Sequence, residues 1–202
     1  MEKLVDVGAI LLEKRNYQSL FSVLGGLTLN CVTRLSELWE KSLDGKVELN
    51  TNLSPLFTFF LSSLQHAQMW SALRHVTSSR NNFKEYRALI AKDEPNTVPY
   101  IGLLLQDILS IEEIPVYVTQ DRKFESQETA ALELLNFERL KKLGINKAVL
   151  LQAQINTVIE DPCNSNLCEY LSSTGVALDR DTLYALSLKI QSRGNRTKKT
   201  RK

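Results

Sequence analysis

The chain has 202 residues, 43% of them hydrophobic and 24% charged, which fits a soluble globular domain that buries its own core without metals. Only 8 Gly and 5 Pro argue against disorder and against a turn-rich all-β fold. The net charge of +2 is uneven, because six basic residues lie in the last ten positions and leave 19 basic against 23 acidic residues before them. This mildly acidic body disfavours nucleic-acid binding, so no nucleic-acid partner is expected.

The ends of the chain and its cysteines indicate a cytoplasmic protein. The N-terminal segment lacks the basic-then-apolar order of a signal peptide, and no run reaches the ~18 apolar residues that a membrane span needs. The odd count of 3 Cys favours ordinary thiols in a reducing compartment. The basic tail, Arg193–Lys202, is expected to be disordered, with contact to an anionic membrane as one possible use.

Apolar residues at helical spacing begin near residue 20. Leu20, Leu24 and Leu27 form one stripe, and a second short stripe runs from Val32 to Trp39. Gly25 and Gly26 lie in the first stripe and either loosen that helix or end it.

The next predicted helix begins at Ser54, a favoured N-cap, followed by Pro55 at the first helical position. Its apolar stripe continues to Val76, and no charged residue occurs from 49 to 73. Both faces are therefore expected to contact protein, from this chain or from a partner. Together with a second helix over Asn82–Lys92, it predicts a helical hairpin over residues 54–92.

Further helices are predicted along the second half of the chain. They cover Val98–Ile111, Glu128–Val158, Leu167–Ser172 and Asp179–Ile190, with Asp179 as the cap of the last one. A β-like run at Val116–Thr119 is too short to change the class. The prediction is an all-α, irregular multi-helix domain over residues 1–192 with a protruding helical hairpin.

Residues for chemical catalysis or metal binding are not evident. His66 and His75 are nine positions apart, which places them on opposite sides of a helix at ~100° per residue. No nucleophile elbow, P-loop or zinc motif is present. We expect no metal, no cofactor and no covalent chemistry.

Five ordered blocks over Leu11–Arg193 resemble the catalytic domain of guanine-nucleotide exchange factors for Ras-family GTPases. They are "KRNYQSLFSVLGGLTLNCVTRLSELWEK", "NNFKEYRALI", "VPYIGLLLQDIL", "LLNFERLKKL" and "LYALSLKIQSR". The residues that carry the likeness are Asn16, Tyr17, Leu20, Gly26, Leu27, Arg34, Leu35, Trp39, Pro99, Gly102, Leu105, Asp107, Asn136 and Phe137.

The resemblance implies a mechanism without side-chain chemistry. In this family a helical hairpin wedges against the first switch of the GTPase while the helical body holds the second switch. The implied GTPase-binding residues are Asn16, Thr33, Met69, Trp70, Leu73 and Arg74. Those implied to support the hairpin are Pro99, Gly102, Leu105 and Asp107. Capping of a helix is an equally good interpretation of Asn16.

The chain also departs from the family pattern. In this family further helices usually come before the segment with which this sequence begins. An insertion also lengthens the segment between Trp39 and Phe83. Arg74 and His75 stand where some members carry an acid on the wedge helix. These departures leave open a second hypothesis, a non-catalytic interaction or scaffold module that binds a GTPase or another protein.

Overall fold

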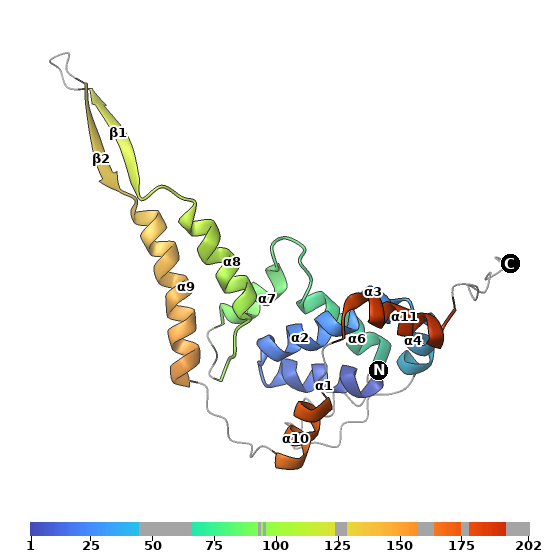
Figure 1. Ribbon diagram of the computed structural model, residues 1–202. Coiled ribbons are helices and arrows are strands. Elements are labelled where there is room, and N and C mark those ends of the chain that lie inside the picture. Colours follow the sequence, from blue (N-terminus) through green and yellow to red (C-terminus); the bar gives the residue numbers. More distant parts are fainter. Residues whose placement is uncertain are drawn as a thin grey trace. The chain divides into compact units, whose positions relative to one another are not determined.

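The computed structural model describes residues 1–44, 66–92, 94, 96–123, 129–156, 164–174 and 178–192 (Figure 1). It divides into two compact units, one made of Met1–Asp93 with Val158–Lys202 and the other of Glu94–Thr157. Helices dominate both units, so the all-α prediction is confirmed. The predicted cap Ser54 and the basic tail lie outside the described residues.

The first unit is built from helices of one to three turns. They are α1 (Glu2–Glu13), α2 (Tyr17–Leu27), α3 (Asn30–Thr33), α4 (Ser36–Leu43), α6 (His66–Val76), α7 (Lys84–Ile90), α10 (Ser165–Thr174) and α11 (Arg180–Ile190). Helix α2 runs through Gly25 and Gly26, so the two glycines do not end it.

The core of the first unit lies where α1, α2 and α6 meet. Its buried side chains include Val5, Leu20 and Leu73, each at most 1% exposed. Gly8 allows α1 to approach α6 closely, since a Cβ there would lie 2.9 Å from Leu73 Cδ1. The ring of Tyr86 on α7 closes the core with edge-to-face contact to Tyr17, at a centroid distance of 5.4 Å.

A buried polar pair joins α1 to α6 inside this core. Asp6 Oδ1 and His66 Nε2 are 3.1 Å apart, and the two side chains are 9% and 5% exposed. Because the removal of one partner leaves a buried polar group with a lost hydrogen bond, the pair constrains how the two helices dock.

Replacement of Asp6 by Ala is expected to lower the free energy of unfolding by about 1–3 kcal/mol, because buried His66 then loses this hydrogen bond. Urea unfolding followed by circular dichroism measures the change. Lys3→Ala, at an exposed position of the same helix, is the control and should stay within about 0.5 kcal/mol of the wild type. An Asp6→Ala protein as stable as the wild type would contradict the pairing.

The predicted hairpin over residues 54–92 contains α6 and α7 in its described part, and these two helices are in contact, whereas residues 54–65 lie outside the described residues. Helix α6 packs against α1, α4 and α7, and it buries His66, Met69 and Leu73. In the described part of the uncharged run, residues 66–73, this chain's own helices cover one face of α6, and Ala67, Gln68, Ser71 and Ala72 are exposed. Helix α6 belongs to the body of the first unit.

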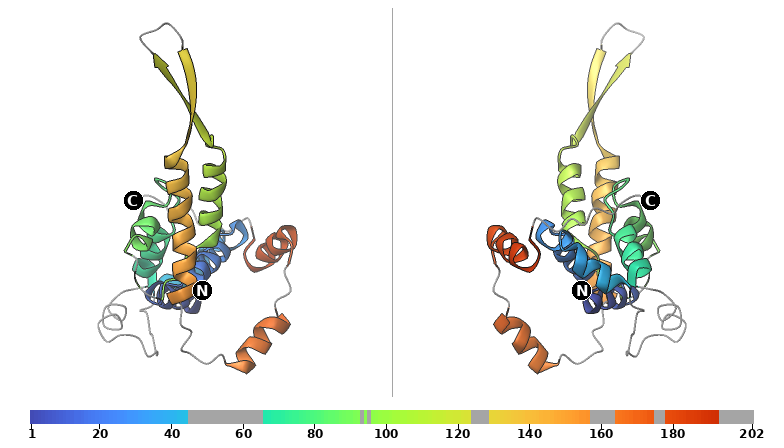
Figure 2. Two further views of the ribbon diagram at one scale, coloured as in Figure 1. Left: turned by 90° about the vertical axis from the view of Figure 1, so that its left-hand side faces the viewer. Right: turned by 90° about the vertical axis from the view of Figure 1, so that its right-hand side faces the viewer.

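The second unit is a pair of helices continued by a two-stranded ribbon. Helices α8 (Ile101–Glu112) and α9 (Phe137–Asn156) pack side by side, as both views in Figure 2 show. Strands β1 (Tyr117–Lys123) and β2 (Thr129–Leu135) pair antiparallel, from Tyr117↔Leu135 to Lys123↔Thr129. This second helical hairpin forms a compact unit of its own.

Two sequence predictions are corrected in this region. The helix predicted over Glu128–Val158 begins only at Phe137, because residues 129–135 form β2. The short β signal at Val116–Thr119 overlaps a seven-residue strand that begins at Tyr117. Pairing with β1 overrides the helix-favouring Ala, Leu and Glu of β2, whose propensities are worth only a few tenths of a kcal/mol each.

Asn136 fastens the ribbon to the helices. Its backbone N–H donates to the Val116 carbonyl at 2.8 Å, and its side-chain Nδ2 donates to the Pro115 carbonyl at 3.0 Å. Its Oδ1 accepts from the Arg139 N–H at 3.1 Å, at the start of α9. One residue therefore holds the exit from α8 against the entry to α9.

The last two helices lie where the sequence predicts them, but the state of one cysteine differs from the prediction. Asp179 caps α11 by accepting from the Thr182 N–H at 3.1 Å, which confirms the predicted cap. Cys168 on α10 is disulfide-bonded whereas Cys31 is a free thiol, so the expectation of ordinary thiols is wrong for Cys168.

Candidate functional site

The residues predicted to bind a GTPase fall into buried and exposed groups within the first unit. Met69 and Leu73 are 3% and 1% exposed and belong to the core. Arg74 and Thr33 are exposed, and Trp70 is half-buried. The structure therefore places only part of the predicted set on the surface.

Trp70 and Arg74 come together with Trp39 at the surface where α4 meets α6. The two indole rings lie 4.7 Å apart at 30°, and the Arg74 guanidinium is 6.0 Å from the centre of the Trp70 ring. Trp39 Nε1 also donates to the Val32 carbonyl at 3.1 Å, one residue before Thr33. This Trp–Arg cluster (Trp39, Trp70 and Arg74) has the composition typical of interface hot spots.

Asn16 and Thr33 both have local roles. Asn16 Oδ1 accepts from the Ser19 N–H at 3.0 Å and caps α2, as the structural interpretation of this residue predicts. Thr33 Oγ1 donates to the Asn30 carbonyl at 3.4 Å, a long hydrogen bond that leaves its exposed side chain accessible.

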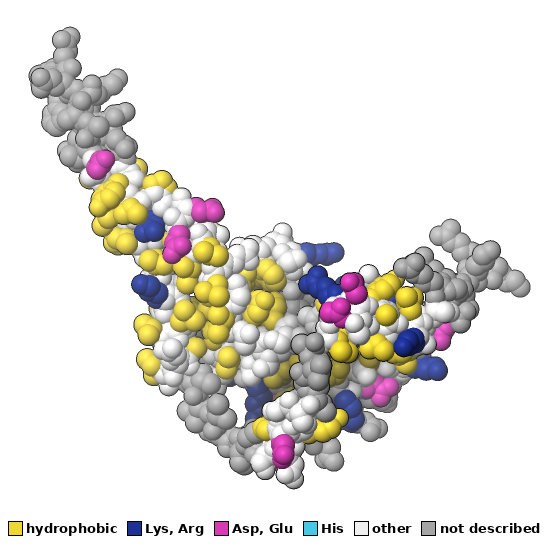
Figure 3. Space-filling view, viewed as in Figure 1, with side chains coloured by type: hydrophobic (Ala, Val, Ile, Leu, Met, Phe, Trp, Pro, Cys, Tyr) yellow, Lys and Arg dark blue, Asp and Glu magenta, His cyan; other side chains and the backbone are white. Residues whose placement is uncertain are grey.

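In the second unit, α8 carries an exposed apolar stripe. Ile101, Leu105 and Leu109 follow one another at i, i+4 and i+8 and are 47%, 54% and 63% exposed. Leu103, Leu104 and Ile111 on the same helix are buried. Figure 3 shows apolar side chains gathered along this unit on the viewed face. Leu105, predicted as hairpin support, is thus a surface residue.

The exposed stripe ends beside two acids. Glu112 and Glu113 are exposed in the last turn and cap of α8, where the negative end of the helix dipole disfavours them by about 0.3–1 kcal/mol each. Neither has an ion-pair partner among the residues that the structure describes. Acids that oppose local stability in this way are typical of functional positions.

The other predicted support residues lie near the start of α8. Pro99 is buried just before the helix. Gly102 accommodates the ring of Tyr100, since a Cβ there would lie 2.7 Å from the phenol oxygen. Asp107 is half-buried in the middle of the helix. Pro99 and Gly102 thus lie at the start of α8, whereas Asp107 lies farther along the helix.

The exposed face of α8 does not follow from the sequence pattern. An apolar residue occupies nearly every position from Ile101 to Leu105, so periodicity alone does not separate the buried face from the exposed one. Two acids at the C-terminal end of an apolar helix are the signal that would have marked this end.

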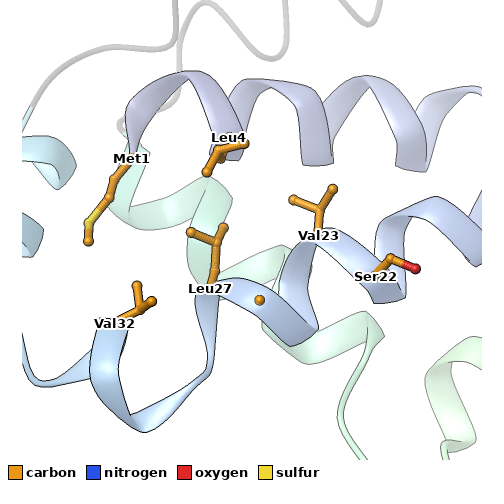
Figure 4. A pocket seen from close by; sticks show the side chains of 7 residues that line it. Met1, Leu4, Ser22, Val23, Leu27 and Val32 are labelled. Carbon is orange, nitrogen blue, oxygen red and sulfur yellow. The ribbon is translucent and has the colours of Figure 1, made fainter. Parts of the chain in front are cut away.

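A pocket of about 370 Å³ lies between α1, α2 and α3 (Figure 4). Its lining residues are Met1, Leu4, Ser22, Val23, Gly26, Leu27 and Val32. Ser22 supplies the one polar side chain among them, without an acid, base or second nucleophile beside it. This pocket has no arrangement for acid–base or nucleophilic chemistry.

The histidines are also separated. His66 is buried against Asp6, while His75 is exposed with its Nε2 3.8 Å from Glu85 Oε1. Within the described ranges no three His, Cys, Asp or Glu side chains are placed to hold a metal ion. Among the same residues, no helix combines the length and the hydropathy that crossing a bilayer requires.

Comparison with known proteins identifies the family. Residues 1–141 match the model of the RasGEF domain. The chain is 26% identical over 195 residues to Ras-specific guanine nucleotide-releasing factor 2 of Rattus norvegicus. The aligned region covers 96% of this chain and 14% of that protein. It is 25% identical over 195 residues to Rap guanine nucleotide exchange factor 5 of Homo sapiens, covering 96% and 28%.

A third relative is Ras guanine nucleotide exchange factor S of Dictyostelium discoideum, 28% identical over 196 residues, with 94% of this chain and 16% of the relative covered. The chain therefore spans between 14% and 28% of the length of these relatives. The family match covers most of the chain and agrees with its helical architecture, with its ordered sequence blocks and with surfaces suited to protein contact. This chain belongs to the RasGEF domain family.

Proposed function

We propose that this chain is a guanine-nucleotide exchange domain that accelerates GDP release from a Ras-family small GTPase. The observation that carries the proposal is the α8–α9 hairpin, whose α8 exposes three apolar side chains at i, i+4 and i+8 and ends in two acids without an ion-pair partner among the described residues. Membership of the RasGEF family and relatives named as Ras and Rap exchange factors support the same activity.

The wedge in this proposal is the α8–α9 hairpin. A wedge element needs its own stiffness and an exposed working surface. Helices α8 and α9 support each other within one unit, and the hydrogen bonds of Asn136 hold the end where they meet the ribbon. Helix α6, by contrast, packs one face against α1 and α4 within the first unit.

The working end in this proposal consists of Leu109 and Glu113, one helical turn apart. Leu109 supplies an exposed apolar side chain that displaces residues of the GTPase near its nucleotide. Glu113 supplies negative charge that repels the phosphates and competes for the magnesium ion. This acid removes the difficulty raised by Arg74 and His75, because those residues are on α6 and outside the wedge.

The energetic basis of the activity is linkage. A partner that binds the nucleotide-free GTPase more tightly than the loaded one lowers nucleotide affinity by the same factor. In this proposal, Thr33 and the Trp–Arg cluster bind the GTPase in both states, whereas the α8 end favours the nucleotide-free state. The first surface sets affinity and the second sets the release rate.

Release of a fluorescent GDP analogue from Ras, Rap and Ral-type GTPases tests the activity. With micromolar chain and excess unlabelled nucleotide, at least one GTPase should release its nucleotide about 5–150-fold faster, as a coupling free energy of about 1–3 kcal/mol gives. Acceleration of none of them would refute the proposal. Tight GTPase binding at an unchanged release rate would instead identify the non-catalytic scaffold.

A further inference from the structure

Arg34, which follows α3 directly, reaches a helix more than 150 positions away in the sequence. Its Nη1 donates to the Ser187 carbonyl at 2.7 Å and to the Ser187 hydroxyl at 3.1 Å. Its Nη2 donates to the Gln191 carbonyl at 2.8 Å, and its Cζ lies 5.6 Å from the centre of the Tyr184 ring. The guanidinium thus occupies the C-terminal end of α11.

This contact suits both partners. The carbonyls in the last turn of a helix lack intrahelical donors, and the helix dipole is negative there, so a cation with a planar set of donors is a favourable partner. Gln191 Nε2 forms a second hydrogen bond between these segments by donating to Ser36 Oγ at 3.0 Å. Helix α11 buries Ser187 but leaves Leu186 and Ile190 40% and 64% exposed. Arg34 is therefore a principal link between α11 and the rest of its unit.

Helix α3 depends on such links for its position. It has four residues, Asn30–Thr33, and buries none of them. A single turn does not hold itself together, because helix nucleation fixes several residues for one hydrogen bond. The indole of Trp39 holds it at Val32 and packs it beside α4, while Arg34 attaches its other end to α11.

We propose that Arg34 is a positioning residue for GTPase binding, and that α11 sets the position of α3, and so of Thr33, through it. The inference rests on the proposed exchange function and deepens it: α11 controls the affinity of the binding surface without taking part in the wedge. Loss of the link weakens GTPase binding and leaves the step driven by α8 unchanged.

The test compares Arg34→Ala and Arg34→Lys with Arg180→Ala, an exposed arginine at the start of the same helix. GDP release is measured over a range of exchange-domain concentrations to separate KM from kcat. Arg34→Ala should raise KM about 2–30-fold with kcat within about twofold of the wild type. Arg34→Lys should recover part of the loss, since it keeps the charge at the helix end but not the paired hydrogen bonds. Arg180→Ala should match the wild type.

Hydrogen exchange on the same proteins follows the link directly. Arg34→Ala should speed exchange at the amides of residues 30–35 and in the last turn of α11, while α8 and α9 keep wild-type rates. Gln191→Ala removes only the Gln191–Ser36 hydrogen bond and should raise KM by a smaller factor than Arg34→Ala. This variant tests the link if Arg34→Ala folds poorly.

The outcomes separate the two proposals. A wild-type chain that accelerates release from none of the GTPases refutes the exchange function and the role of Arg34 with it. An active wild type with an unchanged KM in Arg34→Ala and Gln191→Ala refutes the positioning role alone. A fall in kcat together with faster exchange throughout both units also overturns it, because the residue would then act on overall stability.

Discussion

Replacement of Leu109 by Ala is expected to lower the catalytic efficiency of GDP release about 10–100-fold, through kcat more than through KM. The side chain is 63% exposed, so its truncation removes little buried contact from the chain itself. In the proposed complex it becomes buried only when the nucleotide pocket opens, and an interaction made only in that state contributes to the rate. Stopped-flow release of fluorescent GDP at saturating exchange domain measures kcat.

Leu151→Ala is the matched control for this change. Leu151 is a leucine in the same unit with a similar exposure of 58%, but it lies on α9, near the end opposite to the ribbon. It should retain wild-type kcat, and both variants should unfold within about 0.5 kcal/mol of the wild type. Equal effects of Leu109→Ala and Leu151→Ala on exchange would contradict the assignment of the α8 end as the wedge.

Replacement of Leu73 by Ala is expected to lower the free energy of unfolding by about 2–5 kcal/mol. Leu73 is 1% exposed and its Cδ1 occupies the space that Gly8 leaves open on α1, so truncation creates a cavity at the closest approach of α1 and α6. Urea unfolding gives the free energy, and Leu38→Ala, at an exposed position of α4, should cost far less.

The same variant distinguishes the two possible hairpins. Were residues 54–92 the wedge, Leu73→Ala would impair exchange at temperatures where the protein is fully folded. With α8–α9 as the wedge, the folded fraction of Leu73→Ala keeps the wild-type kcat. Full stability with a lowered kcat would restore the hairpin over residues 54–92.

Local signals in the sequence were reliable where the interaction that decides the structure is itself local. The cap at Asp179 and the helix that follows it depend on a contact three residues away, and both are as predicted. The helical spacing of Leu20, Leu24 and Leu27 likewise predicts α2, which begins directly after its cap at Asn16.

Prediction failed where distant parts of the chain decide. Residues 129–135 are composed of good helix formers, and their strand depends on partners in β1 that local propensity does not include. The uncharged run before Leu73 predicted protein on both faces of its helix, yet Ala67, Gln68, Ser71 and Ala72 in its described part are exposed, and composition does not state whether a helix is covered by its own chain or by a partner. Because of that ambiguity the sequence prediction placed the wedge at residues 54–92, whereas we propose the α8–α9 hairpin. The role of Arg34 was hidden for the same reason, since its partners follow it by more than 150 residues.

The discontinuous first unit has a consequence for how the protein is made. Helix α3 emerges from the ribosome more than 150 residues before the carbonyl groups of Ser187 and Gln191 that receive Arg34. Because contacts of such high sequence separation form slowly, the turn that carries Thr33 lacks its link to α11 until that helix has been synthesised. Under the proposed role of Arg34, a nascent chain would gain its full affinity for a GTPase only after α11 has left the ribosome.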